Sequence, residues 1–239
     1  MLFFYIRHGD PIYNPNSLTP LGERQAEALA KRLALYGVDE IYSSTSERAK
    51  LTAKPTCEIL KKDLVELDFA NESHAARDFM FRRKEKENKV WAFQDREMRL
   101  LFQSPEIRAL GDRWYEHPAL AGYPYESGIE RVYRETDAFF ASLGYEHDRY
   151  TGSYRVVEPN DKRIALFAHQ GFGLLFLSCL LDIPFPQFST HFDLGHTGMT
   201  VIHFGNENGV SIPRVCTLSS DSHLYREGLP TKYNNWLCF

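Results

Sequence analysis

The stretch Leu2-Phe3-Phe4-Tyr5-Ile6-Arg7-His8-Gly9 opens with five apolar residues and ends in Arg-His-Gly. A short apolar run that stops at polar residues is typical of a buried strand. The run delivers its polar groups at the carboxyl end of that strand, which is where ligand sites form in open α/β sheets. We therefore expect a ligand site to begin at Arg7.

The same pattern recurs far along the chain. The run Arg163-Ile-Ala-Leu-Phe-Ala168 predicts a second core strand, and it is followed by His169-Gln-Gly171. Glycines after a strand let an anion approach the backbone N–H groups closely. One histidine in such a place is more often structural, but two at strand ends are more informative.

Strand and helix patterns alternate between these two histidines. Thr19 suits an N-cap and Pro20 a first helical residue, and a helix with apolar spacing is expected from there to a stop at Gly37. A strand at residues 40–42 and a helix over about residues 46–62 follow. Strand-helix-strand-helix order is typical of a parallel α/β sheet. We predict an α/β/α sandwich with a mixed, mainly parallel sheet.

Composition sets limits on size and partners. The chain has 239 residues, 43% hydrophobic and 25% charged, with a net charge of −4. We expect a single domain over residues 1–239, with a helical insertion at about residues 75–121 that is rich in aromatic side chains. The mixed charge run at residues 82–87 indicates a solvated helix face. The last twenty residues are polar and aromatic, and we expect them to form a tail on the surface. The sequence shows no basic field and no membrane-spanning run, so nucleic acid and membrane are poor partners and a cytoplasmic location is expected.

Phosphoryl transfer is the chemistry that these residues favour. An imidazole such as His8 can attack phosphorus and hold the phosphoryl group covalently. Positive charge must then surround the phosphoryl oxygens, and Arg7 is adjacent. Arg48 falls at the start of the helix after the second strand, where a guanidinium and a helix N-terminus can bind phosphate together. Asn14 could donate an amide N–H to the same anion.

Taken in order, these segments resemble the histidine phosphatase superfamily, in its phosphoglycerate-mutase-like branch. Residues 7–9 are its Arg-His-Gly, and Asn14 lies at the usual offset. Residues 18–26, Leu-Thr-Pro-Leu-Gly-Glu-Arg-Gln-Ala, resemble its "LTxxGxxQA" segment. Residues 42–49 resemble the segment of its second arginine, and residues 167–169 the strand of its second histidine.

That resemblance implies a role for each site residue. His8 is the implied nucleophile, and Arg7, Arg48 and His169 hold the phosphoryl group. The implied proton donor is Glu72, although the glycine that usually follows it is missing. Glu126 is the rival acid. For Glu126, a place in the pocket and a solvent-exposed position at the start of a helix are equally expected. The remaining expected contacts to substrate come from Gly9, Asn14, Gln170 and His196.

The expected net reaction is hydrolysis of a small phosphate monoester, and the sequence does not name the substrate. No metal or cofactor is expected, because His191, Asp193, His196 and His203 match no common zinc spacing. A mutase that returns the phosphoryl group to its substrate is the runner-up. A catalytically inactive module that binds a phosphorylated ligand is the alternative from another class. A homodimer is a plausible assembly, and the oligomeric state stays open.

Overall fold

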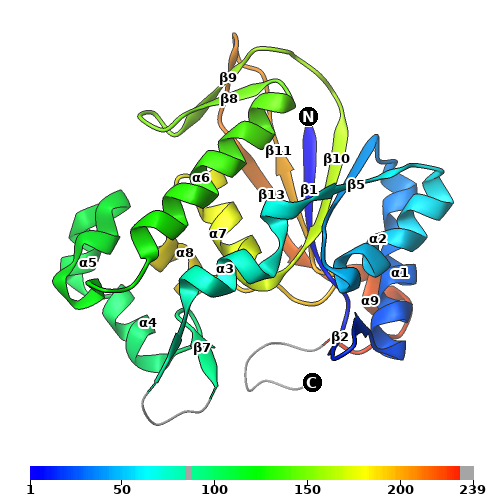
Figure 1. The fold of residues 1–239 in the computed structure, drawn as a ribbon. Helices are drawn as coiled ribbons and strands as arrows, with labels where there is room; N and C mark the ends of the chain where they lie inside the picture. Colours follow the sequence, from blue (N-terminus) through cyan, green and yellow to red (C-terminus); the bar gives the residue numbers. More distant parts are fainter. Residues whose placement is uncertain (84–87, 232–239) are drawn as a thin grey trace.

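A six-stranded sheet forms the centre of the computed structural model, which describes residues 1–83 and 88–231 (Figure 1). Its strand order is β13-β11-β1-β10-β4-β5. The strands are β1 (Leu2–Arg7), β4 (Glu40–Ser44), β5 (Leu64–Leu67), β10 (Arg163–Ala168), β11 (Met199–His203) and β13 (Arg214–Ser220). β1, β10, β4 and β5 run parallel, whereas β11 and β13 pair in antiparallel fashion. The predicted mixed, mainly parallel sheet is confirmed.

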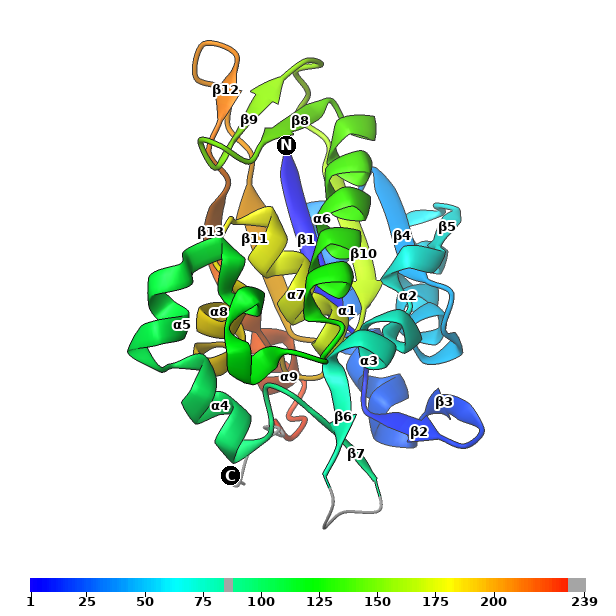
Figure 2. The same ribbon diagram turned by 60° about the vertical axis from the view of Figure 1, so that its left-hand side comes forward.

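Helices cover both faces of this sheet, as the two ribbon views show (Figures 1 and 2). One layer contains α1 (Pro20–Tyr36) and α2 (Glu47–Leu60), and the other contains α3 (Glu72–Phe79), α6 (Tyr125–Ser142) and α7 (Gln170–Leu180). Side chains alternate along β1 because successive residues of a strand point to opposite faces. Phe4 and Ile6 join the core beneath α1 and α2, while Phe3 and Tyr5 join the core beneath α6 and α7. Burial on both faces explains why the run is apolar without interruption.

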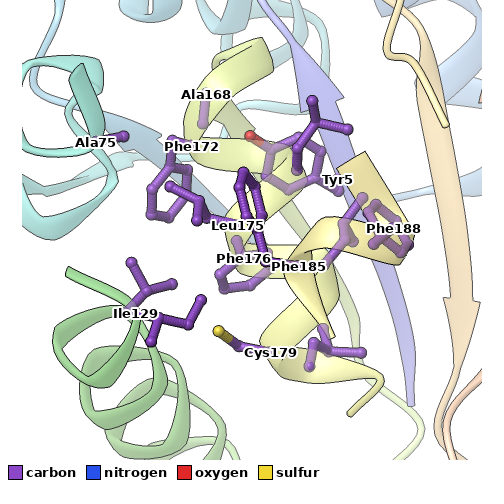
Figure 3. Packing of buried hydrophobic residues seen from close by; sticks show 14 of the residues in the cluster. Tyr5, Ala75, Ile129, Ala168, Phe172, Leu175, Phe176, Cys179, Phe185 and Phe188 are labelled. Atoms are coloured by element: carbon purple, nitrogen blue, oxygen red, sulfur yellow. The ribbon is translucent and has the colours of Figure 1, made fainter. Parts of the chain in front are cut away.

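The larger of the two cores is aromatic (Figure 3). Tyr5 from β1 lies against Phe172 and Phe176 of α7, with the Tyr5 and Phe176 ring centroids 5.6 Å apart. Phe185 and Phe188 close the same cluster from α8 (Phe185–His191). Full burial of each such ring contributes about 2 to 3 kcal/mol. This packing fixes α7 against β1 beneath the histidines that follow β1 and β10.

The first helix begins and ends where its sequence indicates. The Thr19 hydroxyl accepts a hydrogen bond of 3.0 Å from the Gly22 N–H, and Pro20 is the first helical residue. At the other end Gly37 has a φ of 72°, and its N–H donates to the Leu33 carbonyl. A left-handed residue here favours glycine, because it lacks a Cβ.

The aromatic segment between α3 and α6 is only partly helical. It contains α4 (Arg96–Phe102), α5 (Pro105–Leu110), 3₁₀ turns at Gly111–Glu116 and Pro118–Leu120, and a hairpin of β6 (Met80–Arg82) and β7 (Lys89–Trp91). The expectation of a helix over the charge run was wrong for Arg82, which ends β6, and residues 84–87 lie outside the described part. Apolar cross-strand pairs, Met80 with Trp91 and Phe81 with Val90, stabilise the hairpin instead.

Short elements complete the described chain. They are the hairpin β2 (Pro11–Tyr13) and β3 (Asn16–Leu18), the sheet of β8 (Tyr145–Asp148), β9 (Ser153–Val156) and β12 (Val210–Ser211), the 3₁₀ turn Asp68–Ala70, and α9 (Ser222–Arg226). The predicted surface tail was wrong for α9, because Leu224 and Leu229 pack against Ala28 of α1. Residues 232–239 lie outside the described part. No helix among the described residues is long and apolar enough to cross a membrane.

A buried histidine joins three elements far from the sheet edge. The imidazole of His147 in β8 donates from Nδ1 to Asp137 of α6 at 2.8 Å and from Nε2 to Asp182 after α7 at 2.9 Å. Its ring stacks on Tyr154 with the centroids 4.3 Å apart. Burial alone would lower the pKa of His147, but the hydrogen bonds to Asp137 and Asp182 outweigh it and raise that pKa to about 9.

This raised pKa predicts that the protein loses stability above neutral pH. Because the folded-state pKa lies above the ordinary value of 6.5, the contribution is complete below pH 6.5 and is lost as pH rises through 9. The free energy of unfolding should fall by up to about 3 kcal/mol over that interval. His147→Gln should flatten the dependence in urea titrations, and His191→Gln, at an exposed histidine, should keep it. Parallel curves for the native and His147→Gln proteins would contradict this account.

Candidate active site

The parallel pairing of β1 with β10 brings the two predicted histidines together. Arg7 pairs with Ala168 in register, so His8 and His169 leave neighbouring strands at the same edge of the sheet. Their ring centroids are 5.2 Å apart. The ring of His196, from the loop before β11, lies 5.7 Å from that of His8. Three imidazoles therefore meet where the sequence predicts a ligand site.

The hydrogen bonding of His8 leaves one nitrogen ready to react. Its Nδ1 lies 2.7 Å from the Gly9 carbonyl, and because that oxygen can only accept, Nδ1 carries the proton. Burial and then the charge of Arg7 and the neighbouring His169 lower the pKa of His8 well below its ordinary value. A neutral ring protonated on Nδ1 keeps its lone pair on Nε2. His8 is thus held in the form that a nucleophile needs.

Arg7 is a buried cation fixed by neutral acceptors. Its guanidinium donates to the Leu194 carbonyl at 2.6 Å and to Nε2 of His196 at 2.8 Å. Burial lowers the pKa of Arg7, because water no longer solvates the charge. A desolvated guanidinium held in one orientation favours an anion beside it.

Arg48 is held by Asn16, a residue that the sequence analysis did not single out. The Asn16 Oδ1 accepts from the Arg48 guanidinium at 3.2 Å, and its Nδ2 donates to the Ser46 hydroxyl at 3.0 Å. Asn14, which was predicted to donate to the anion, lies exposed in the turn between β2 and β3. The prediction missed this because the sequence offset does not show the hairpin register, which puts Asn16 on β3 beside α2.

His169 is anchored through its backbone and its ring. The buried Tyr5 hydroxyl donates to the His169 carbonyl at 2.6 Å and accepts from its N–H at 3.3 Å. The ring Nε2 lies 2.8 Å from the Ser44 hydroxyl at the end of β4. Burial, then the charges of Arg48 and Arg7, lower the pKa of His169 well below its ordinary value. The sequence did not reveal Tyr5 as a positioning residue, since it reads as one more apolar strand residue.

Three buried nitrogens around these residues have no hydrogen-bond partner in the described part of the chain. They are Nε of Arg7, Nε of Arg48 and Nδ1 of His169. An unpaired buried donor costs about 1 to 3 kcal/mol, so such groups are normally satisfied by protein, water or ligand. Their convergence on His8 indicates a site that an anion completes.

Glu72 is the acid that the structure brings to this group. Its two carboxylate oxygens accept from the N–H groups of Gly171 and Phe172 in the first turn of α7, at 2.9 and 2.8 Å. Burial raises the pKa of Glu72, although these two bonds and the charges of Arg48 and Arg7 oppose the rise. A raised pKa extends the pH range in which the carboxyl keeps its proton, as a proton donor requires. Glu126 instead lies exposed on the first turn of α6, with its charge acting on Tyr115.

The other predicted contacts are mostly engaged within the protein. The Gly9 N–H donates to the Thr52 hydroxyl at 2.9 Å, and a Cβ on Gly9 would lie 2.7 Å from the Gly22 carbonyl. A glycine is therefore required at position 9 because the backbone packs closely on α1. The predicted reason was a contact with phosphate. The side chain of Gln170 donates to Asp193, and its backbone N–H, the group predicted to contact the substrate, lies at the start of α7. His196 accepts from Arg7 and lies 3.5 Å from Asp10 through its other nitrogen.

Trp91 of β7 forms one wall beside the acid. A Cβ built on Gly171 would lie 2.5 Å from the Trp91 ring, so the indole rests directly on the backbone of the first turn of α7. The same glycine donates its N–H to Glu72. No group of three or more metal-ligating side chains suited to an ion is present among the described residues.

Fold and site together define an α/β protein with two histidines and two arginines gathered at one sheet edge. Residues 3–119 match the sequence profile of the histidine phosphatase superfamily (branch 1). The chain is thus a member of the histidine phosphatase superfamily, as its motifs indicated.

Solved structures of phosphatases share the fold at low sequence identity. A phosphoserine phosphatase mutant from Entamoeba histolytica, in complex with phosphoserine, is 19% identical with a TM-score of 0.58, covering 93% of this chain and 98% of that one. A mycobacterial glucosyl-3-phosphoglycerate phosphatase is 18% identical with a TM-score of 0.58, covering 92% and 98%. A putative α-ribazole-5′-phosphate phosphatase from Escherichia coli is 21% identical with a TM-score of 0.57, covering 92% and 98%. No curated protein sequence matches this chain.

The two asparagines of the β2–β3 hairpin offer a matched test of the site. Asn16→Ala removes the amide that holds the Arg48 guanidinium and should weaken the binding of inorganic phosphate about tenfold, the size of one hydrogen bond to a charged group. Asn14→Ala should change the affinity by less than about twofold. Titration calorimetry measures both. An Asn14→Ala effect as large as that of Asn16→Ala would contradict the assignment.

Proposed function

We propose that this protein hydrolyses phosphate monoesters of small molecules through a phosphohistidine on His8. The proposal rests above all on the three unpaired nitrogens of Arg7, Arg48 and His169 that surround a neutral His8. The oxygens of a tetrahedral dianion can accept from both guanidinium groups, and from His169 when the Ser44 hydroxyl donates to Nε2 and Nδ1 carries the proton. The membership of the superfamily, and the phosphatase names of the structures that share the fold, support the same reaction class.

In the first step, Nε2 of His8 attacks phosphorus as the P–O bond to the leaving group breaks. The Glu72 carboxyl gives its proton to the departing alkoxide, which leaves as an alcohol. The phosphoryl oxygens are held by Arg7, Arg48 and His169. These groups are already in place, so they stabilise the negative charge of the transition state better than water would. The phosphoryl group is then bonded to His8.

In the second step, a water molecule attacks phosphorus and the P–N bond breaks. The Glu72 carboxylate accepts the proton of that water, so the acid of the first step becomes the base of the second. Inorganic phosphate leaves and His8 regains its lone pair. Glu72 must be protonated at the start, so turnover should fall as pH rises through its raised pKa.

Removal of the nucleophile tests the covalent step. His8→Ala should lower the turnover of p-nitrophenyl phosphate at least about 1,000-fold and abolish the acid-labile, alkali-stable label that the native protein acquires from a ³²P-labelled ester. His203→Ala, at an exposed histidine of β11, should keep both. Equal turnover by the native and His8→Ala proteins would contradict hydrolysis. Rapid interconversion of 2- and 3-phosphoglycerate would favour the mutase reaction instead.

The proton donor is tested by the basicity of the leaving group. Glu72→Gln should lower kcat/KM for an alkyl phosphate about 100-fold or more but lower kcat/KM for p-nitrophenyl phosphate much less, because kcat/KM reports the first step alone and nitrophenolate leaves without a proton. The variant should also lose the decline of kcat at higher pH. Glu126→Gln should behave as the native protein with both esters. A larger effect at Glu126 than at Glu72 would exchange the two assignments.

A further inference from the structure

A second pocket lies between α1 and α9, outside the group around His8. Its volume is about 350 Å³, which is in the range of small-molecule sites. Figure 1 shows α9 beside α1, in the helix layer that also contains α2. Ala28 and Leu35 supply an apolar part of the lining, and the rest is polar.

Positive charge dominates the polar lining. Lys31, Arg32 and Arg226 face one carboxylate, that of Glu227, which pairs with Lys31 at 2.7 Å. The guanidinium of Arg32 donates to the carbonyl and the hydroxyl of Ser220 at 3.2 and 3.1 Å, and both of these acceptors are neutral. No carboxylate pairs with Arg32 or Arg226 among the described residues. A concave site with unbalanced guanidinium groups favours an oxyanion.

A chain of hydrogen bonds leads from this pocket towards Arg7. The Thr197 hydroxyl donates to the His196 carbonyl at 2.7 Å, so it can only accept from Nε2 of His223, which lies 3.0 Å away. His223 then has its lone pair on Nδ1, which faces the Arg32 guanidinium at 3.5 Å. Burial, and then the charge of Arg32, lower the pKa of His223 to about 4, which keeps the ring neutral.

Thr197 is where this chain of bonds meets the catalytic backbone. Its N–H donates to the carbonyls of Arg7 and His8 at 3.0 and 3.3 Å. Its φ of 52° is left-handed, an unusual conformation for a β-branched residue that surrounding contacts must hold in place. Hydrogen bonds thus connect the His223 ring, through Thr197, to the backbone carbonyls of Arg7 and His8.

We propose that the α1–α9 pocket binds a small molecule carrying a phosphate-like oxyanion and that its occupancy lowers turnover at His8. The oxyanion engages Arg32 and Arg226 while its carrier contacts Ala28 and Leu35. Arg32 then turns from His223 to the ligand. The support of Thr197 weakens, and with it the placement of Arg7.

Binding is tested with inorganic phosphate and with phenylphosphonate, whose P–C bond the proposed hydrolysis does not cleave. Titration calorimetry on the native protein should show two sites, and Arg48→Ala should weaken only the one at His8. Arg226→Gln should weaken the other at least about tenfold, while Arg24→Gln, at an exposed arginine of α1 outside the pocket, should change neither. Tighter binding of phenylphosphonate than of phosphate at the second site indicates a carrier-bound ligand, and the reverse order indicates free phosphate.

Coupling is tested by inhibition of p-nitrophenyl phosphate turnover. Phenylphosphonate should lower kcat two- to fivefold in the native protein, in addition to competing at His8. Arg226→Gln should keep the native kcat without ligand, but at least about tenfold more phenylphosphonate should be needed to lower its kcat. Arg32→Gln should have a kcat two- to fivefold below the native value even without ligand, because the contact with His223 is already lost. In that variant phenylphosphonate should act only as a competitive inhibitor.

Two results would overturn the proposal. A single site by calorimetry, or a second site whose affinity Arg226→Gln leaves unchanged, would contradict ligand binding in the α1–α9 pocket. Purely competitive inhibition of the native protein would contradict the coupling between the pocket and His8. The calorimetric arms, together with the imidazole NMR shift of His223 on titration, do not depend on the proposed hydrolysis, so a failure of turnover would leave the binding test intact.

Discussion

The register between β1 and β10 is the constraint on which the site depends. Arg7 pairs with Ala168, so a slip of one residue would turn His8 or His169 to the wrong face of the sheet. Apolar packing on both faces of β1 fixes that register, since a slipped β1 would exchange the residues of the two cores. The chemistry at the sheet edge thus follows from packing several residues away from it.

Burial shifts the pKa values of the proposed nucleophile and the proposed proton donor in opposite directions. It lowers the pKa of His8, whose charged form is protonated, and raises the pKa of Glu72, whose charged form is deprotonated. A neutral base and a protonated acid can therefore coexist over one range of pH. The N–H groups of Gly171 and Phe172 in α7 limit the rise in the pKa of Glu72, because they stabilise the carboxylate after the proton has left.

Much of the fold could be predicted because the decisive signals are local. An apolar run, an N-capping threonine and a glycine stop each depend on a few neighbouring residues, and β1 and α1 follow them. The ordered motifs likewise placed His8, His169, Arg48 and Glu72 in one region of the fold.

What the sequence did not reveal depends on contacts between distant segments. Asn16 reaches Arg48 because of a hairpin register, and Gly9 is required by the close approach of the Gly22 carbonyl. The burial of α9 needs a partner about 200 residues earlier in the chain, so no local pattern marks it.

The contact of Trp91 with Gly171 limits which other hairpins could occupy this position beside Glu72. The β6–β7 hairpin, which carries Trp91, packs against Gly171, the same residue whose N–H donates to Glu72. A different hairpin could therefore change the surface beside Glu72 without changing the two backbone N–H bonds that hold the carboxylate, provided that it still fits against a residue without a side chain.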